Sequence, residues 1–278
     1  MEERKCIWCC LAEPQVTFVK EAHIVPQSLG GKRVCKNVCD ACNAYFGNKR
    51  AGVPSVEEAI KETFAITRDM ILLAEGEIGK TKKRKWHSSL FFKVDFVKRS
   101  VSVKPAYRLR RGFQEMMSRQ VARGLYKMLL ETIEADSGTA LDPKYDFIRE
   151  FARYDLGDYP VFYFLRRLGL LLTMTEAFKK PEILIMEPRM KYLLNTDSFV
   201  EFEFLGHVIG LPKSKQAYLV NDQYMAQTRE AKLKLFHGFV LVKYFNDIDL
   251  SLNVLKDGGG YERWLLSQYG TRLWLFAA

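Results

Sequence analysis

The sequence lacks several features that would place it in a special class of protein. No apolar run reaches the roughly 18 to 20 residues that a membrane-spanning helix needs. The N-terminus, Met1 to Cys6, has no apolar stretch of the kind found in secretory signals, so we expect a cytoplasmic protein without a membrane partner. Six cysteines in 278 residues are too few for a disulfide scaffold, and clustered cysteines in a reducing compartment more often bind metal.

The residues that are present indicate a folded protein with a localised positive charge. Hydrophobic residues make up 48% of the chain, which is enough to bury the core of one or two domains. The net charge is +10, and residues 80–111 alone carry 12 basic side chains against one acidic side chain. This concentration favours a polyanionic partner such as nucleic acid, although a solvated, lysine-rich face would have the same composition.

Apolar periodicities predict an α+β fold. Ser55, followed three residues later by Glu58, is typical of a helix start, and Asp142 before Pro143 is another. From residue 160 onward, short apolar runs predict the strands of a mostly antiparallel sheet. The other predicted elements are helices over 55–73, 114–135 and 143–154, and a hairpin over 88–104.

The helix predicted over 114–135 is amphipathic. Its apolar side is expected to pack against the core, and its charged residues lie elsewhere on the helix. The apolar side consists of Met117, Val121, Leu125, Met128 and Leu129, and the charged residues are Arg119, Arg123, Lys127 and Glu131.

The cysteines form two C-x-x-C pairs about 30 residues apart. Two thiolates on a tight knuckle can face one cation, and two knuckles complete a tetrahedral zinc site. A zinc ion with four protein ligands has no open position, so its role would be structural. The predicted zinc ligands are Cys6, Cys9, Cys39 and Cys42, and the spare cysteines, either of which could replace a neighbour, are Cys10 and Cys35.

Between and after these pairs, the sequence resembles a known family. His23-Ile24-Val25-Pro26 is followed by Gly30-Gly31, and Asn43 comes directly after the second cysteine pair. This order of residues is similar to that of the zinc-containing HNH endonucleases, which are ββα-metal nucleases. The resemblance covers about residues 6–50.

The resemblance implies roles for three residues. His23 would end the first strand and act as general base, since imidazole can be neutral at cellular pH. Asn43 would open the helix and bind the divalent cation through its carbonyl oxygen, a hard ligand that suits Mg²⁺ or Mn²⁺. Asn37 is the candidate for the middle asparagine of the motif, which braces the loop near the catalytic histidine; an ordinary turn asparagine is the alternative.

One position departs from the family pattern. Many members carry an acidic residue directly before the catalytic histidine, and this chain has Ala22 there. The cation could be held by Asn43 and several waters, because Mg²⁺ keeps much of its hydration shell. Alternatively, Glu21 or Asn48 supplies the missing oxygen, or the site is weakened or inactive.

The basic stretch after this module is expected to contact nucleic acid. Lysine and arginine can neutralise phosphates, and interleaved aromatic residues such as Phe91, Phe92 and Tyr107 could stack on bases or belong to the core of a sheet. The predicted nucleic-acid-binding residues are Lys82, Lys83, Arg84, Lys85, Arg108, Arg110 and Arg111.

These observations predict a small, zinc-stapled ββα-metal module over residues 1–52. A helical and basic, strand-rich connector over 53–111 and a larger mixed helical and antiparallel-sheet domain over 112–278 would follow. We expect a metal-dependent endonuclease that hydrolyses DNA, with RNA left open as a substrate, in a setting such as prokaryotic or phage defence or a mobile element. The alternative is an inactive zinc protein that binds nucleic acid. Sensing, target positioning or homo-oligomerisation are the roles considered for residues 112–278.

Overall fold

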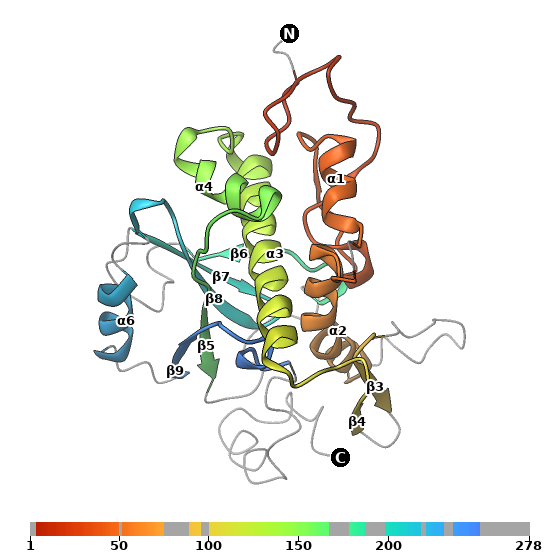
Figure 1. Ribbon diagram of the computed structural model, residues 1–278, viewed down its shortest axis with the longest axis vertical. Coiled ribbons are helices and arrows are strands. Elements are labelled where there is room, and N and C mark those ends of the chain that lie inside the picture. Colours follow the sequence, from red (N-terminus) through yellow and green to blue (C-terminus); the bar gives the residue numbers. More distant parts are fainter. Residues whose placement is uncertain are drawn as a thin grey trace.

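The computed structural model describes residues 4–49, 52–74, 89–95, 100–166, 178–186, 198–217, 221–230 and 236–250. Within them the chain has the predicted α+β fold, in which a small N-terminal module precedes a larger mixed part (Figure 1). The strands are β1 (Ala22–His23), β2 (Val34–Cys35), β3 (Phe92–Asp95), β4 (Ser100–Val103), β5 (Phe162–Arg166), β6 (Leu184–Ile185), β7 (Phe199–Phe204), β8 (His207–Pro212) and β9 (Phe236–Leu241). The main helices are α1 (Asp40–Gly47), α2 (Val56–Ala74), α3 (Arg111–Ser137), α4 (Asp146–Ile148) and α6 (Asn221–Glu230).

The N-terminal module consists of a minimal hairpin and a helix. In β1 and β2, Ala22 pairs with Cys35 and His23 pairs with Val34, antiparallel. The connection turns through a short 3-10 helix, and a Cβ atom at Gly31 would overlap the Val25 carbonyl, so the turn needs glycine there. Helix α1 follows directly, which gives the predicted ββα order.

Helix α3 runs through the middle of the molecule, with the five-stranded sheet on one side and α1 and α2 on the other (Figure 1). It ends at Gly138, whose left-handed backbone (φ 67°) terminates the helix. Helix α2 starts as predicted, because the Ser55 hydroxyl accepts from the Glu58 backbone N–H at 3.1 Å. Among the described residues, no helix is both long and apolar enough to cross a bilayer.

The sheet is fully antiparallel within the described residues and has the order β6-β7-β8-β5-β9. Successive side chains alternate between its two faces. On one face, the Phe64 ring of α2 packs against Phe204 and His207, with ring centroids 4.9 Å apart in both contacts. On the other face, Tyr224 of α6 packs against Phe162 and Phe199, so helices cover both faces of the sheet.

The helix predicted over 143–154 is irregular. The Asp142 carboxylate caps its start by accepting from the Lys144 backbone N–H at 2.9 Å, as expected. The chain then forms a 3-10 turn over Pro143–Tyr145, α4, and a π-helical turn over Arg149–Arg153. The Ala152 carbonyl accepts from the Arg123 guanidinium of α3, so tertiary contacts set the geometry of this turn.

The predicted hairpin forms as β3 and β4, and the aromatic residues beside it are packed against the core. Phe91 is 3% exposed and Phe92 is 8% exposed. The Phe91 ring makes edge contacts with Tyr107, Phe113 and Phe245. These rings are therefore core residues, and the suggestion that they stack on bases is wrong for Phe91 and Phe92.

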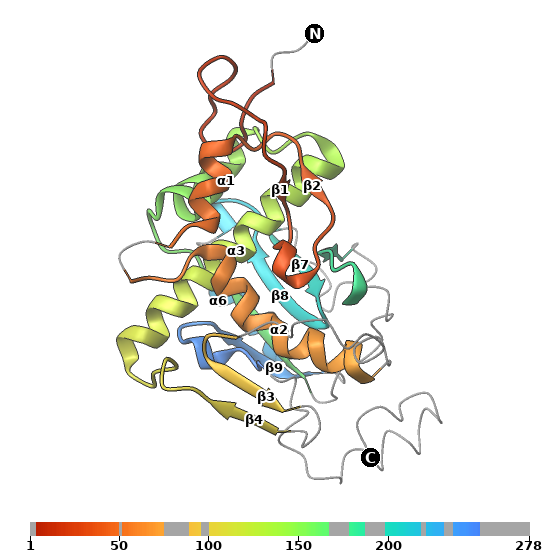
Figure 2. The same cartoon turned by 90° about the vertical axis from the view of Figure 1, so that its right-hand side faces the viewer.

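Most of the buried side chains form one large cluster that extends from the cysteine-bearing module through α2 and α3 to the sheet, and a smaller cluster surrounds Tyr224. Figure 2 shows the same arrangement from the side, with α2 between α1 and the hairpin and in front of α3. The division at residues 52 and 111 stays a prediction, but the module over residues 1–52 packs on the helices that follow it.

Helices α2 and α3 approach closely at Gly124. A Cβ atom there would overlap Ile60 Cγ1 and lie 2.7 Å from Ile60 Cδ1. We predict that Gly124→Ala lowers the free energy of unfolding by about 1 to 3 kcal/mol, because it overpacks this crossing. Gly112→Ala on the same helix is the control, since nothing lies within 4 Å of its added Cβ. Denaturant unfolding measures both, and equal stability of the two variants would contradict the close approach.

Candidate functional site

Four cysteines meet at one end of the N-terminal module. The Sγ atoms of Cys6, Cys9, Cys39 and Cys42 all lie within 4.8 Å of one another, and those of Cys9 and Cys39 are 3.8 Å apart. Zn–S bonds of about 2.3 Å in a tetrahedron require sulfur atoms about 3.8 Å apart. The cluster therefore fits a structural zinc ion with four thiolate ligands.

The surroundings of the cluster suit thiolates. The backbone N–H groups of Trp8 and Cys39 point at Cys6 Sγ at 3.5 and 3.4 Å, and Arg153 Nε donates to Cys42 Sγ at 3.3 Å. A hydrogen bond from Cys42 lowers the pKa of Cys6 to about 4, whereas burial raises the pKa of Cys9 to about 11. Thiols this close cannot all ionise beside one another, so four thiolates need a cation such as Zn²⁺ between them.

The two spare cysteines lie apart from this cluster. Cys10 is exposed, and its backbone has a φ of 58° at the end of the first knuckle. Cys35 is buried in β2 opposite Ala22, and burial raises the pKa of its thiol. The predicted assignment of the four ligands therefore agrees with the cluster that forms.

His23 ends β1, and its side chain is 13% exposed. The Gln27 side-chain nitrogen lies 2.6 Å from His23 Nε2. The other ring nitrogen, Nδ1, is buried and has no hydrogen-bond partner among the described residues. Glu21 Oε2 lies 3.8 Å from the same Nε2, and the Glu21 side chain is 75% exposed. Nε2 thus lies beside the Gln27 amide and an exposed carboxylate, whereas Nδ1 faces the interior.

Asn43 lies in the first turn of α1, next to the strand that carries His23. Its Nδ2 donates to the Glu21 backbone carbonyl at 3.1 Å, which leaves Oδ1 as the amide atom that can bind a cation. The structure therefore brings the predicted base and the predicted cation ligand together through Glu21.

Asn37 lies on the second knuckle and makes different contacts. Its carbonyl accepts from the Ile7 backbone N–H at 2.9 Å, and its Nδ2 donates to Glu134 of α3 at 2.5 Å. These bonds join the two knuckles to each other and to α3. Its predicted part in catalysis stays a prediction.

Part of the predicted nucleic-acid-binding surface can be located. Arg108, Arg110 and Arg111 are exposed just before and at the start of α3. Arg108 and Arg110 line a cleft of about 740 Å³ together with Lys49, which comes directly after α1. Arg111 Nε donates a hydrogen bond to Glu115 Oε1 at 2.7 Å. The other predicted residues, Lys82, Lys83, Arg84 and Lys85, lie outside the described residues.

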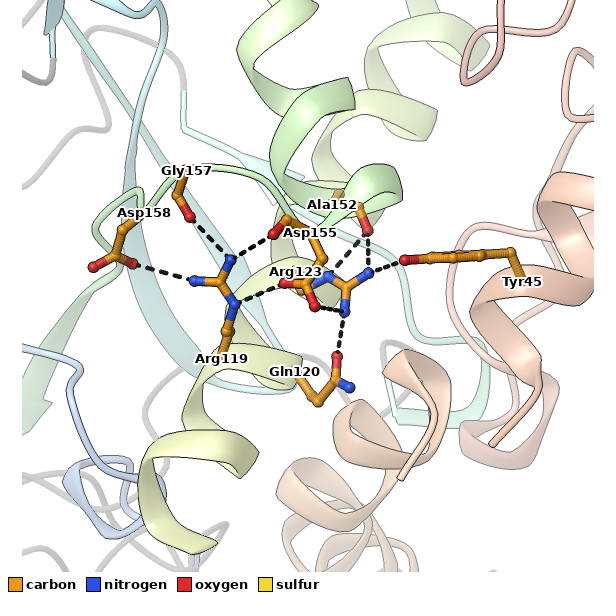
Figure 3. A network of polar contacts seen from close by, with 8 residues as sticks. All are labelled: Tyr45, Arg119, Gln120, Arg123, Ala152, Asp155, Gly157 and Asp158. Atoms are coloured by element: carbon orange, nitrogen blue, oxygen red, sulfur yellow. Dashed lines mark hydrogen bonds and ion pairs between the residues drawn. The ribbon is translucent and has the colours of Figure 1, made fainter. Parts of the chain in front are cut away.

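Charged side chains of helix α3 bind the N-terminal module. The sequence pattern had predicted that these side chains lie away from the buried side of the helix. Arg123 is 4% exposed and donates to the Tyr45 hydroxyl of α1 (Figure 3). Lys127 and Glu131 are 2% and 0% exposed. An i,i+4 lysine–glutamate pair is usually a feature of an exposed helix face, so the pattern concealed their burial. The only sequence signal for the burial of Lys127 and Glu131 is that both lie close to the apolar side of the helix.

We predict about one zinc ion per chain, and its loss when any one of the four ligands becomes serine. Because binding of structural zinc contributes on the order of 10 kcal/mol to the folding of small modules, such variants should lose the local structure of residues 6–52. Elemental analysis measures the zinc, and Cys10→Ser, which removes an exposed thiol outside the cluster, should retain it. Folded wild-type protein without zinc would contradict the assignment.

Comparison with known proteins agrees with this geometry. Residues 6–52 match the model of a family described as HNH endonuclease. This range contains the four cysteines, His23, Asn37 and Asn43, and it covers a small part of the chain. No curated protein and no solved structure was found to match. The N-terminal part of the chain, residues 6–52, is therefore similar to the HNH endonuclease family.

Proposed function

We propose that this protein is a metal-dependent endonuclease that hydrolyses phosphodiester bonds of DNA. The observation that supports this most strongly is the juxtaposition of His23 and Asn43 within the module that matches the family. His23 offers an imidazole nitrogen, Asn43 offers a carbonyl oxygen, and both residues contact Glu21. Hydrolysis of a phosphodiester needs both a base and a site for a cation.

The chemistry assigned to His23 is proton abstraction. Its Nε2 takes a proton from a water molecule, and the resulting hydroxide attacks phosphorus. The bond from phosphorus to the leaving sugar oxygen then breaks, and that oxygen takes up a proton. The Gln27 amide lies 2.6 Å from Nε2, so it must move away before the attacking water can bind there.

Asn43 Oδ1 and the Glu21 carboxylate would hold the divalent cation. Mg²⁺ or Mn²⁺ bound there would neutralise charge on the phosphate and the leaving oxygen. Ala22 is 1% exposed, so position 22 faces the core, whereas the Glu21 side chain is exposed beside His23. Asn48 caps the far end of α1, about 7 Å along the helix from Asn43 at 1.5 Å per residue. Of the two substitutes for an acidic residue at position 22, the geometry favours Glu21.

The exposed arginines support a polyanionic substrate. Arg108 and Arg110 line the same cleft as Lys49, which follows α1 by two residues. A strand bound at His23 and Asn43 could therefore extend along α1 toward these cations. Phosphate contacts of this kind give affinity without sequence information, so they are equally compatible with DNA and RNA.

A second candidate function is nucleic-acid binding without catalysis. The observation that favours it is Ala22 itself, since it leaves the site with one carboxylate that is 75% exposed and therefore weakly held. Nicking of supercoiled plasmid by purified protein, with and without Mg²⁺, separates the two. Cleavage that depends on the cation supports the endonuclease, and binding without cleavage supports the alternative.

We predict that His23→Ala lowers the cleavage rate by about 10²- to 10⁴-fold, because it removes the general base. Asn43→Ala should also abolish cleavage at ordinary Mg²⁺ concentrations. Asn48→Ala is the matched control, since Asn48 is an exposed asparagine at the other end of the same helix. All three variants should retain zinc. Wild-type rates for His23→Ala would show that its assigned role is wrong.

We predict that Arg108→Ala combined with Arg110→Ala flattens the dependence of DNA affinity on salt. Each phosphate contact contributes about 0.9 to the slope of log K against log salt, so the slope should decrease by up to about two units. Lys213→Ala combined with Lys215→Ala removes the same charge at the same spacing from an exposed part of the larger domain. Fluorescence anisotropy at several salt concentrations measures both. A slope that changes only with the lysine pair would locate the DNA path elsewhere.

A further inference from the structure

A buried lysine of α3 binds the backbone of the strand that carries His23. Lys127 Nζ donates to the His23 carbonyl at 3.0 Å and lies 3.4 Å from the Ile24 carbonyl. It also donates to Glu131 Oε2 at 2.9 Å. An ammonium group has three donors, which these three acceptors can use. A second carboxylate oxygen, Glu57 Oε1 of α2, lies 3.7 Å from Nζ, and the Glu57 side chain is 28% exposed.

This ion pair is costly to bury. Lys127 is 2% exposed and Glu131 is 0% exposed, and burial raises the pKa of Glu131 to about 7. Replacing a buried ion pair with apolar residues of similar size often leaves a protein as stable or makes it more stable. Packing alone therefore gives no reason for a lysine here, whereas binding two backbone carbonyls requires a donor.

The other end of the pair reaches the zinc cluster. Glu131 Oε1 accepts from Trp8 Nε1 at 3.0 Å. Trp8 lies between the zinc ligands Cys6 and Cys9, and its ring packs edge-on against Phe46 of α1 at 4.8 Å. A continuous path of polar contacts therefore runs from the first zinc knuckle through α3 to the carbonyl of His23.

Helix α3 also holds the element that carries Asn43. Arg123 precedes Lys127 by one turn and binds Tyr45, two residues after Asn43 (Figure 3). The same guanidinium is fixed by the Ala152 carbonyl and by Asp155, 3.2 Å away. Strand β1 and helix α1 are thus both bound to adjacent turns of one rigid helix outside the matched range of residues 6–52.

We propose that Lys127 is a positioning residue of the nuclease site, which sets the orientation of the His23 imidazole by holding the carbonyls of residues 23 and 24. The proposal rests on the function proposed above. Strand β1 pairs with β2 along one edge, and Lys127 of α3 binds the carbonyl groups of residues 23 and 24. The peptide group between residues 23 and 24 is held on its other side, because the Ile24 N–H donates to the Arg33 carbonyl at 3.0 Å, so Lys127 provides the contact on the carbonyl side.

The test is the double variant Lys127→Met with Glu131→Gln. Methionine removes the donors at similar volume, and glutamine removes the charge that would be left unpaired while still accepting from Trp8. We expect the variant to keep one zinc ion and a KM for duplex DNA within about twofold of wild type, with kcat reduced about ten- to a hundredfold, as for losses of groups that orient catalytic ligands. Lys127→Arg, which keeps the charge and the donors, should restore much of kcat.

Arg149→Met is the matched control. Arg149 is 5% exposed, donates to the carbonyls of Ala140 and Asp142, and binds Asp146, so it repeats the pattern of Lys127 away from the module. This variant should lose stability and keep kcat. If it lowers kcat as much as the double variant does, the effect of Lys127 is general destabilisation and the proposal is wrong.

A second readout does not depend on cleavage. The chain has four histidines, so the ¹³Cε1–¹Hε1 NMR signal of His23 can be assigned by its loss in His23→Ala. In the double variant this signal should shift or broaden, while that of His207, which is buried in the sheet, stays in place. If the double variant does not fold, Glu131→Gln alone should move the His23 signal in the same way, because it loosens the ammonium.

The outcomes separate this proposal from the proposed function. An unchanged His23 signal together with wild-type kcat overturns the role of Lys127 and leaves the endonuclease intact. A displaced signal in a protein whose wild type does not cleave DNA overturns the endonuclease and supports the positioning role.

Discussion

The requirement that four thiolates surround one cation as a tetrahedron constrains the N-terminal part of the molecule. Cys6 and Cys39 are 33 residues apart in sequence, and bringing them together closes a loop that contains the whole of β1 and β2. Hairpins with strands of two residues are not stable alone. Cys39 is also the N-cap residue of α1, so a cation bound by the four thiolates would fix where this helix starts and where Asn43 lies one turn later.

Charged residues then join this module to the rest of the chain. Arg123, Lys127 and Glu134 of α3 reach Tyr45, the His23 carbonyl and Asn37. Such contacts are directional, whereas apolar packing tolerates small shifts between surfaces. They are suited to holding a strand and a helix at a defined separation, which the proposed reaction would require of His23 and Asn43.

The predictable parts of the structure were those that depend on local chemistry. The cysteine spacing predicted the metal cluster, Ser55 and Asp142 predicted helix starts, and apolar runs after residue 160 predicted an antiparallel sheet. The missed parts depend on what lies opposite a residue in space. Lys127 and Glu131 have the spacing of a surface pair, and only the packing of the N-terminal module against α3 buries them. Similarly, Phe91 follows a basic run yet is covered by Phe113 and Phe245 from distant segments.

The dependence of β1 on Lys127 has a consequence for the order in which the protein is made. Ribosomes add about 5 to 20 residues per second, so the 75 residues between Gly52 and Lys127 take about 4 to 15 s to synthesise. During that interval the cysteine knuckles can already form, but the lysine that binds the His23 carbonyl does not yet exist. A nascent chain would therefore carry the N-terminal module without the contacts that α3 makes with it. Strand β1 gains this support only after most of α3 has been synthesised and has folded back onto the module.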